Sequence, residues 1–70
     1  MTWTHRGGNA WTAHSGTSVI GGIYEVAGQL NWWFGFNNEF GRATTVKEGK
    51  RRLADAWANW LVATGLREIA

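Results

Sequence analysis

The chain has 70 residues, with seven Lys or Arg, five Asp or Glu and a formal net charge of +2. It contains no cysteine, which excludes both a disulfide framework and a cysteine-based zinc site. The charge falls well short of the strongly basic extreme found in nucleic-acid-binding domains. Because a core of this size rarely yields more than roughly 3–5 kcal/mol, the six Trp, three Phe and one Tyr are the main resource for stability, and a homodimer would bury further rings.

The first segment, "TWTHR" followed by "AWTAH", predicts a β-hairpin around residues 7–9, whose two glycines and one asparagine suit a turn. Alternation divides its side chains between two faces. One face carries Trp3, His5, Trp11 and Ala13, and the other carries Thr4 and Thr12. Two interpretations of residues 1–17 stay open: the segment extends the sheet formed by the later strands, or it covers the outer face of that sheet.

Two further strands are predicted by "SVIGGIYEVA" and "LNWWFGFN", joined around Gly28. A three-residue loop over residues 27–29 pairs Tyr24 with Trp32, and it separates apolar from polar side chains better than a two-residue turn that starts at Gly28. This register directs one set of side chains toward the helix: Ile20, Tyr24, Val26, Leu30, Trp32, Phe34 and Phe36. The outer face then carries Val19, Gly21, Ile23, Glu25, Asn31, Trp33, Gly35 and Asn37.

The segment "TVKEGKRRLADAWANWLVATG" predicts an amphipathic helix over about residues 45–64. Thr45 and Glu48 form a capping-box pattern at its start, and Gly65 suits the left-handed conformation that closes a helix. Gly49 falls on the apolar stripe. Since glycine lowers helix stability, its presence there indicates a close approach of the helix backbone to the sheet.

These elements predict an α+β fold, an antiparallel sheet of three or four strands within about residues 2–37 with one long C-terminal helix packed on one face. We expect a single domain over residues 1–70. The N-terminus lacks the basic start and apolar run of a signal peptide, and no stretch approaches the ~20 apolar residues of a membrane span. We therefore expect a soluble, cytoplasmic protein without a membrane partner.

Residues able to carry catalysis are sparse and scattered. The five acids suggest no paired acid–base site, and His5 and His14, with no cysteine or acidic cluster nearby, make a poor set of metal ligands. The glycine-rich "RGGN" and "IGGI" lack the Lys-Ser/Thr of a phosphate-binding loop. The sequence therefore predicts a non-enzyme with no catalytic residues, cofactor, metal or small-molecule substrate.

The outer face supplies the first functional hypothesis, a protein-binding module. Trp33 and Ile23 pair across the strands on that face, and such an apolar patch with few charges is typical of an interface core. We predict Trp33, Ile23, Val19 and Asn31 as the contact surface for a protein partner or for a second copy of the chain in a homodimer. An adaptor or inhibitor from a phage or another mobile element would have this size. The plainer interpretation is that the N-terminal segment buries Trp33.

The alternative is a nucleic-acid-binding domain. Lys47, Lys50 and Arg51 are the densest basic cluster, and together with Arg42 they could contact phosphates while Trp33 stacks on an unpaired base. The plainer interpretation of the helix residues is a solvated face with weak ion pairs. We favour the protein partner, because the basic cluster lies on the helix and Trp33 lies on the far side of the sheet.

The order of "SVIGGIYEV", "WWFG" and "FGRATTVKEGKRRLADA" resembles the three-stranded-sheet-plus-helix DNA-binding domains of plant AP2 factors and of phage integrase arm-binding domains. The resemblance spans roughly residues 18–62 and implies a last strand that leads into a helix packed behind the sheet. It also implies basic and aromatic side chains on the exposed sheet face, for entry into the DNA major groove. The matching strands offer only Glu25, with no Lys or Arg between Arg6 and Arg42, so the resemblance supports the fold more than the function.

Overall fold

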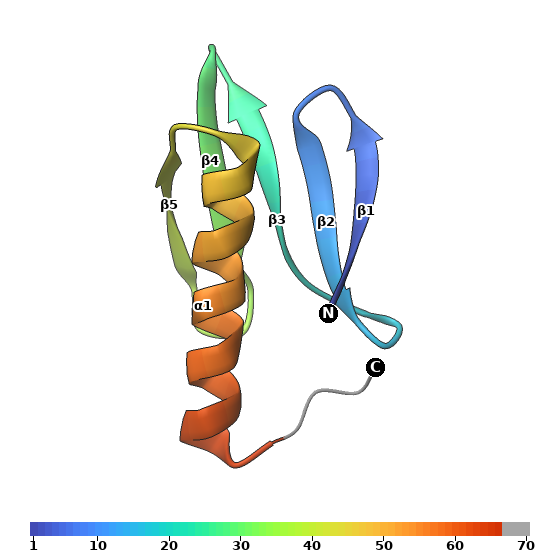
Figure 1. Cartoon of the computed structure of the whole chain (residues 1–70), viewed down its shortest axis with the longest axis vertical. Coiled ribbons are helices and arrows are strands. Elements are labelled where there is room, and N and C mark those ends of the chain that lie inside the picture. The colour runs from blue at the N-terminus through green and yellow to red at the C-terminus, as the bar shows by residue number, and fades with distance from the viewer. Residues whose placement is uncertain (67–70) are drawn as a thin grey trace.

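The structure is a computed structural model that describes residues 1–66 (Figure 1). Five strands precede one helix: β1 Thr2–Gly7, β2 Ala10–Ser15, β3 Ser18–Val26, β4 Gln29–Phe34, β5 Glu39–Ala43 and α1 Val46–Thr64. The strands form one antiparallel sheet in chain order, and α1 lies on one face of it. This arrangement confirms the predicted α+β class. The single domain over residues 1–70 stays a prediction, because residues 67–70 lie outside the described part.

Strand β5 is the element that the sequence did not predict. The expected strands ended at about residue 37, whereas Glu39–Ala43 pairs with β4 and sets Phe40 opposite Trp33. The segment "EFGRA" contains one aromatic ring, one glycine and two charged residues. Its alternation is therefore too weak to mark a strand, and pairing with β4 decides its conformation.

The N-terminal hairpin extends the sheet and does not cover its outer face. β1 pairs with β2 so that Trp3 lies opposite Ala13 and His5 opposite Trp11, as the alternation predicted. β2 pairs in turn with β3. The hairpin therefore continues both faces of the sheet, with its two tryptophans on the side of α1.

The register between β3 and β4 differs from the predicted register by one residue. The turn contains two residues, Ala27 and Gly28, with φ angles of 51° and 77°, and Ile23 pairs with Trp32. Positive φ at both central residues is the pattern of a type I′ turn, whose twist matches that of the flanking strands. The predicted register was chosen because it separates apolar from polar side chains, and it was wrong. The observed turn runs against the preference of alanine, which rarely adopts positive φ, at a cost of about 1–2 kcal/mol.

This difference turns the second half of β3 to the opposite side of the sheet. Tyr24 and Val26, which the predicted register buried, lie exposed on the side away from α1. Ile23, which was predicted on the outer face, is 2% exposed and packs beneath the helix. A methyl group at Gly49 would lie 3.1 Å from Ile23 Cδ1, which confirms the close approach predicted for that glycine.

Ile20 keeps its predicted position on the helix side because of a β-bulge. The pairing of β2 with β3 shifts between Ala13 and His14, so the extra residue restores Ile20 to the side of α1. The core between the sheet and α1 consists of buried Ala13, Ile20, Phe34, Leu53, Ala56 and Trp57. Trp32, Trp60 and Leu61 pack around it and stay partly accessible.

Helix α1 begins and ends at the predicted residues. The hydroxyl of Thr45 accepts a hydrogen bond from the backbone N–H of Glu48 at 3.0 Å. The Glu48 carboxylate accepts from the backbone N–H and the hydroxyl of Thr44, at 3.1 and 3.2 Å, in place of the Thr45 N–H of a standard capping box. Gly65 closes the helix at a φ of 70°. Within residues 1–66, no helix has the length and apolar character needed to cross a membrane.

Ala27→Asn should stabilise the protein, because Asn tolerates positive φ better than alanine and Asn-Gly is a preferred type I′ pair. We expect the free energy of unfolding, measured by urea denaturation, to rise by about 0.5–1 kcal/mol. Ala58→Asn, at an exposed position of α1, is the control and should lower it by about 0.7 kcal/mol through weaker helix propensity. A loss of stability in the Ala27 variant would contradict the two-residue turn.

Candidate functional site

The side of the sheet away from α1, here called the outer face, is covered by no element within residues 1–66. Alternation and pairing assign its side chains to all five strands. They are Thr2, Thr4, Arg6, Thr12, His14, Val19, Tyr24, Val26, Gln29, Asn31, Trp33, Phe40 and Arg42. Phe40 is 78% exposed, Val26 58% and Tyr24 40%. The outer face is thus an aromatic surface in contact with solvent.

Trp33 lies along the middle of the outer face, where two glycines make room for its ring. It pairs with Gly22 of β3, and a methyl group at Gly22 would lie 2.9 Å from Trp33 Nε1. A methyl group at Gly35 would lie 3.2 Å from Cζ3, on the opposite end of the indole. Because both ends of the ring lie close to glycine backbone, the indole packs on the sheet and is half-buried.

The structure keeps three of the four residues predicted for protein binding on one surface. Val19, Asn31 and Trp33 lie on the outer face, whereas Ile23 lies under α1 and leaves the predicted patch. In place of Ile23, the residues that lie near Trp33 on the outer face are Tyr24 and Phe40, neither of which was predicted as a contact residue.

Tyr24 and Phe40 are the residues that sequence reasoning missed. Tyr24 was assigned to the core through the one-residue error in register, and Phe40 belongs to the unpredicted strand β5, where it lies directly opposite Trp33. The sequence did hold a signal for Tyr24. Of the two neighbours Ile23 and Tyr24, isoleucine is the better residue to bury, because the phenol hydroxyl of tyrosine then stays in water. For Phe40 the sequence offered no comparable signal.

Two arginines flank the aromatic centre of the outer face. Arg6, on edge strand β1, donates its Nε–H to Thr12 Oγ1 at 3.2 Å, and the same oxygen lies 3.0 Å from His14 Nε2. Arg42, on the opposite edge strand β5, is exposed and faces Asn31 of β4. Within residues 1–66, neither guanidinium has a carboxylate within ion-pair distance.

The acidic side chains of the described residues lie elsewhere. Glu25 and Glu39 alternate onto the helix side of β3 and β5, while Glu48 and Asp55 belong to α1. Glu68 lies outside the described residues. Over residues 1–66 the outer face therefore carries positive charge without negative charge, a potential that attracts an anionic partner.

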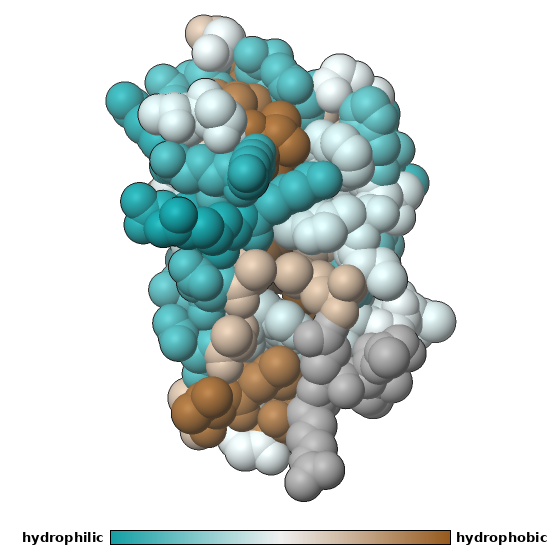
Figure 2. Space-filling view, in the orientation of Figure 1, coloured by the Kyte–Doolittle hydropathy of each residue, from teal (hydrophilic) through white to brown (hydrophobic). Residues whose placement is uncertain are grey.

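The four basic residues predicted as a nucleic-acid site do not come together. Lys47 and Arg51 are exposed on the solvent side of α1, and Figure 2 shows hydrophilic side chains gathered over the first half of this helix. Arg42 lies on the outer face, on the other side of the sheet. Lys50 is half-buried and turns toward the N-terminal hairpin. One ligand cannot contact all four.

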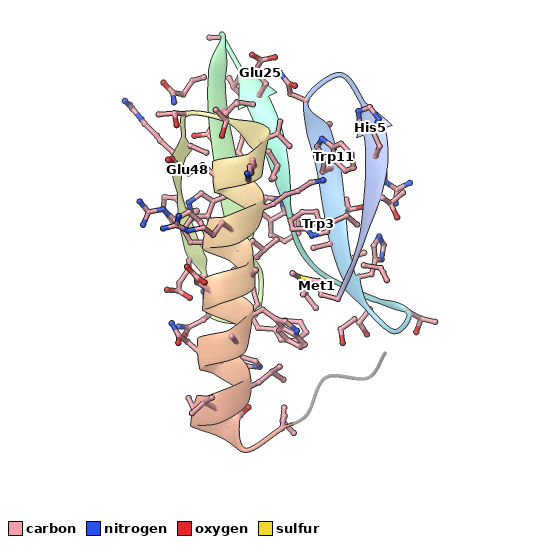
Figure 3. All side chains as sticks on the ribbon, viewed as in Figure 1. Met1, Trp3, His5, Trp11, Glu25 and Glu48 are labelled. Atoms are coloured by element: carbon pink, nitrogen blue, oxygen red, sulfur yellow. The ribbon has the colours of Figure 1, made fainter. Side chains whose placement is uncertain are left out.

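Lys50 joins α1 to the N-terminal hairpin through a cation–π contact. Its Nζ lies 3.5 Å from the centre of the Trp11 ring and 5.4 Å from that of Trp3. Figure 3 shows Trp11 over the N-terminal hairpin and Trp3 nearer to the helix. His5 stacks on the Trp11 ring at 4.3 Å and donates its Nε2–H to the carbonyl of Gly8 at 2.7 Å. This stack therefore positions the hairpin against α1.

The two histidines occupy opposite sides of the sheet. His5 lies on the helix side with Trp11, and His14 lies on the outer face with Thr12. They cannot share one metal ion or one substrate. In the part of the chain that the structure describes, no three His, Cys, Asp or Glu side chains lie close enough to hold a metal ion.

Comparison of the chain with protein-family models, with curated proteins and with solved structures gave no match. The geometry of the outer face is therefore the basis for a functional proposal.

Lys50→Met should lower the free energy of unfolding by about 1 kcal/mol, because methionine keeps much of the apolar stem but removes the ammonium over Trp11. Urea denaturation measures the change. Lys47→Met, on the exposed side of α1, is the matched control and should change the free energy by no more than about 0.5 kcal/mol. Equal effects of the two substitutions would mean that the cation–π contact contributes nothing.

Proposed function

We propose that this chain is a small non-enzymatic binding module whose outer face is the contact surface for a macromolecular partner. The observation that carries the proposal is the exposure of Tyr24 and Phe40 beside Trp33, on a sheet face that no described element covers. Burying such rings would favour folding, so rings left in water at neighbouring positions indicate a surface kept for a partner.

The composition of the outer face supports the same proposal. Interface centres are enriched in aromatic residues and arginine and depleted in acidic residues. Around Trp33 the outer face offers Tyr24 and Phe40 as rings, Asn31 as a polar group and Arg42 as a positive charge. A flat sheet presents these groups on rigid strands, so binding requires little ordering of the backbone.

A protein partner, including a second copy of the chain, is one candidate occupant. Val19 and Val26 extend the exposed aromatic surface with aliphatic side chains, which suits a protein interface. If the occupant is a protein, the chain would act as an adaptor, as an inhibitor or as one half of a homodimer, and we place it in the cytoplasm. The sequence-based reason for preferring it over nucleic acid was the separation of the basic residues from Trp33, and Arg42 on the outer face weakens that reason.

The two exposed rings should make little contribution to folding. We expect Tyr24→Thr and Phe40→Thr to change the free energy of unfolding by at most about 0.5 kcal/mol, since threonine suits an exposed strand position. Phe34→Ala, in the core, is the comparison and should cost about 3–5 kcal/mol in the same urea titration. A large loss of stability in either threonine variant would assign the ring a structural role.

Site-specific photocrosslinking tests the binding surface directly. Benzoylphenylalanine placed at Phe40 should give an adduct in cells of the organism that encodes the chain, seen on a denaturing gel as a band or a smear of lower mobility. The same group at Asn59, exposed on the solvent side of α1, is the control and should give none. Absence of an adduct at Phe40, or equal adducts at both positions, would contradict the proposed surface.

A further inference from the structure

We infer that the occupant of the outer face is a single-stranded nucleic acid, whose bases stack on Tyr24, Trp33 and Phe40 and whose phosphates contact Arg6 and Arg42. This inference rests on the proposed function and names the partner class for the same surface. It uses a different set of residues from the basic cluster of α1, which lies on the other side of the molecule.

Charge complementarity is the first argument. Among residues 1–66 the outer face holds two arginines and no acid, so an anionic polymer meets attraction at both edges of the sheet. Arg42 has no carboxylate partner among residues 1–66, and Arg6 uses its Nε–H toward Thr12 while its terminal N–H groups remain to donate. Guanidinium groups match the geometry of phosphate oxygens.

The arrangement of the rings is the second argument. Phe40 lies opposite Trp33 on the neighbouring strand, about 5 Å away, and Tyr24 lies two residues beyond Gly22, the partner of Trp33, about 7 Å along β3. The three rings thus stand on three neighbouring strands of one sheet face, each as a separate stacking position. Aromatic side chains on an open antiparallel sheet are a recurring means of stacking unpaired bases.

The same features disfavour the other occupants. A second copy of the chain docked face to face would bring four arginines into an interface to which residues 1–66 of neither copy bring an acid, at a cost in desolvation. A double helix hides the faces of its bases, so it cannot stack on rings that lie on a flat sheet. Single strands present both the phosphates and the base faces that this surface fits.

Fluorescence anisotropy with labelled 12-nucleotide oligothymidine and oligouridine, and with a 12-base-pair duplex, tests the inference. We expect a single strand to bind more tightly than the duplex. Two phosphate contacts predict a slope of about −1.4 in a plot of log K against log salt, so raising the salt from 50 to 200 mM should weaken binding about sevenfold. A salt-independent affinity, or a preference for the duplex, would overturn the inference.

Variants locate the contact. Tyr24→Ser and Phe40→Ser should each weaken single-strand binding at least fivefold. In Arg42→Gln, raising the salt from 50 to 200 mM should weaken binding only about threefold, in place of about sevenfold. Arg51→Gln, on the solvent side of α1, is the matched control and should leave affinity unchanged. Trp33→Ala is avoided, because loss of the ring would uncover Gly22 and disturb the sheet. Binding that depends on Arg51 and not on the outer face would contradict the assignment.

The crosslinked adduct separates failure of this inference from failure of the proposed function. An adduct at Phe40 that nuclease shortens supports a nucleic-acid occupant. A different result would be an adduct that resists nuclease but is removed by protease, together with no single-strand binding at 50 mM salt. This result would overturn the inference, while the proposed function would stand with a protein as the partner. No adduct at Phe40 would overturn both.

Discussion

The hairpin turn between β3 and β4 is the constraint on which the rest of the structure depends. With Ala27 and Gly28 both at positive φ, the turn fixes a register that sends Ile23 under the helix and Tyr24 to the outer face. Ile23 then meets the helix at Gly49, where a methyl group would lie 3.1 Å from Ile23 Cδ1 and the absence of a side chain lets α1 come close without a shift of Ile23. A single backbone conformation therefore sets both the packing of the core and the chemistry of the surface.

Glycine and tryptophan act as pairs on both sides of β4. Trp32 packs on Gly41 of β5 on the helix side, and Trp33 packs on Gly22 of β3 on the outer face, each ring lying over its directly opposite partner. Glycine weakens a strand because it has no side chain to pack, and the neighbouring indole supplies that contact. Adjacent tryptophans at residues 32 and 33 thereby tie β4 to both of its neighbours, which helps a small chain without disulfides to hold a five-stranded sheet.

The distribution of contacts across the sheet relates stability to function. The helix side uses its rings for packing, with Phe34 buried against Trp57 and with Lys50 bridging to Trp11. The outer face keeps Tyr24 and Phe40 in water and holds positive charge at its edges. The proposed binding surface is thus built on strands whose position is fixed from behind by α1, an arrangement that keeps a contact surface rigid without burying it.

The sequence by itself determined the helix, its caps at Thr45 and Gly65, the N-terminal hairpin and the α+β class, because these features depend on local periodicity and on residues with strong conformational preferences. It also placed Trp33 on the outer face. Only the tertiary structure decided the register at Ala27, strand β5 and hence the surface around Phe40. An alanine at positive φ contradicts its own preference, and a five-residue strand with weak alternation forms because a neighbour offers its hydrogen bonds. Both are consequences of pairing between segments, which no local pattern records.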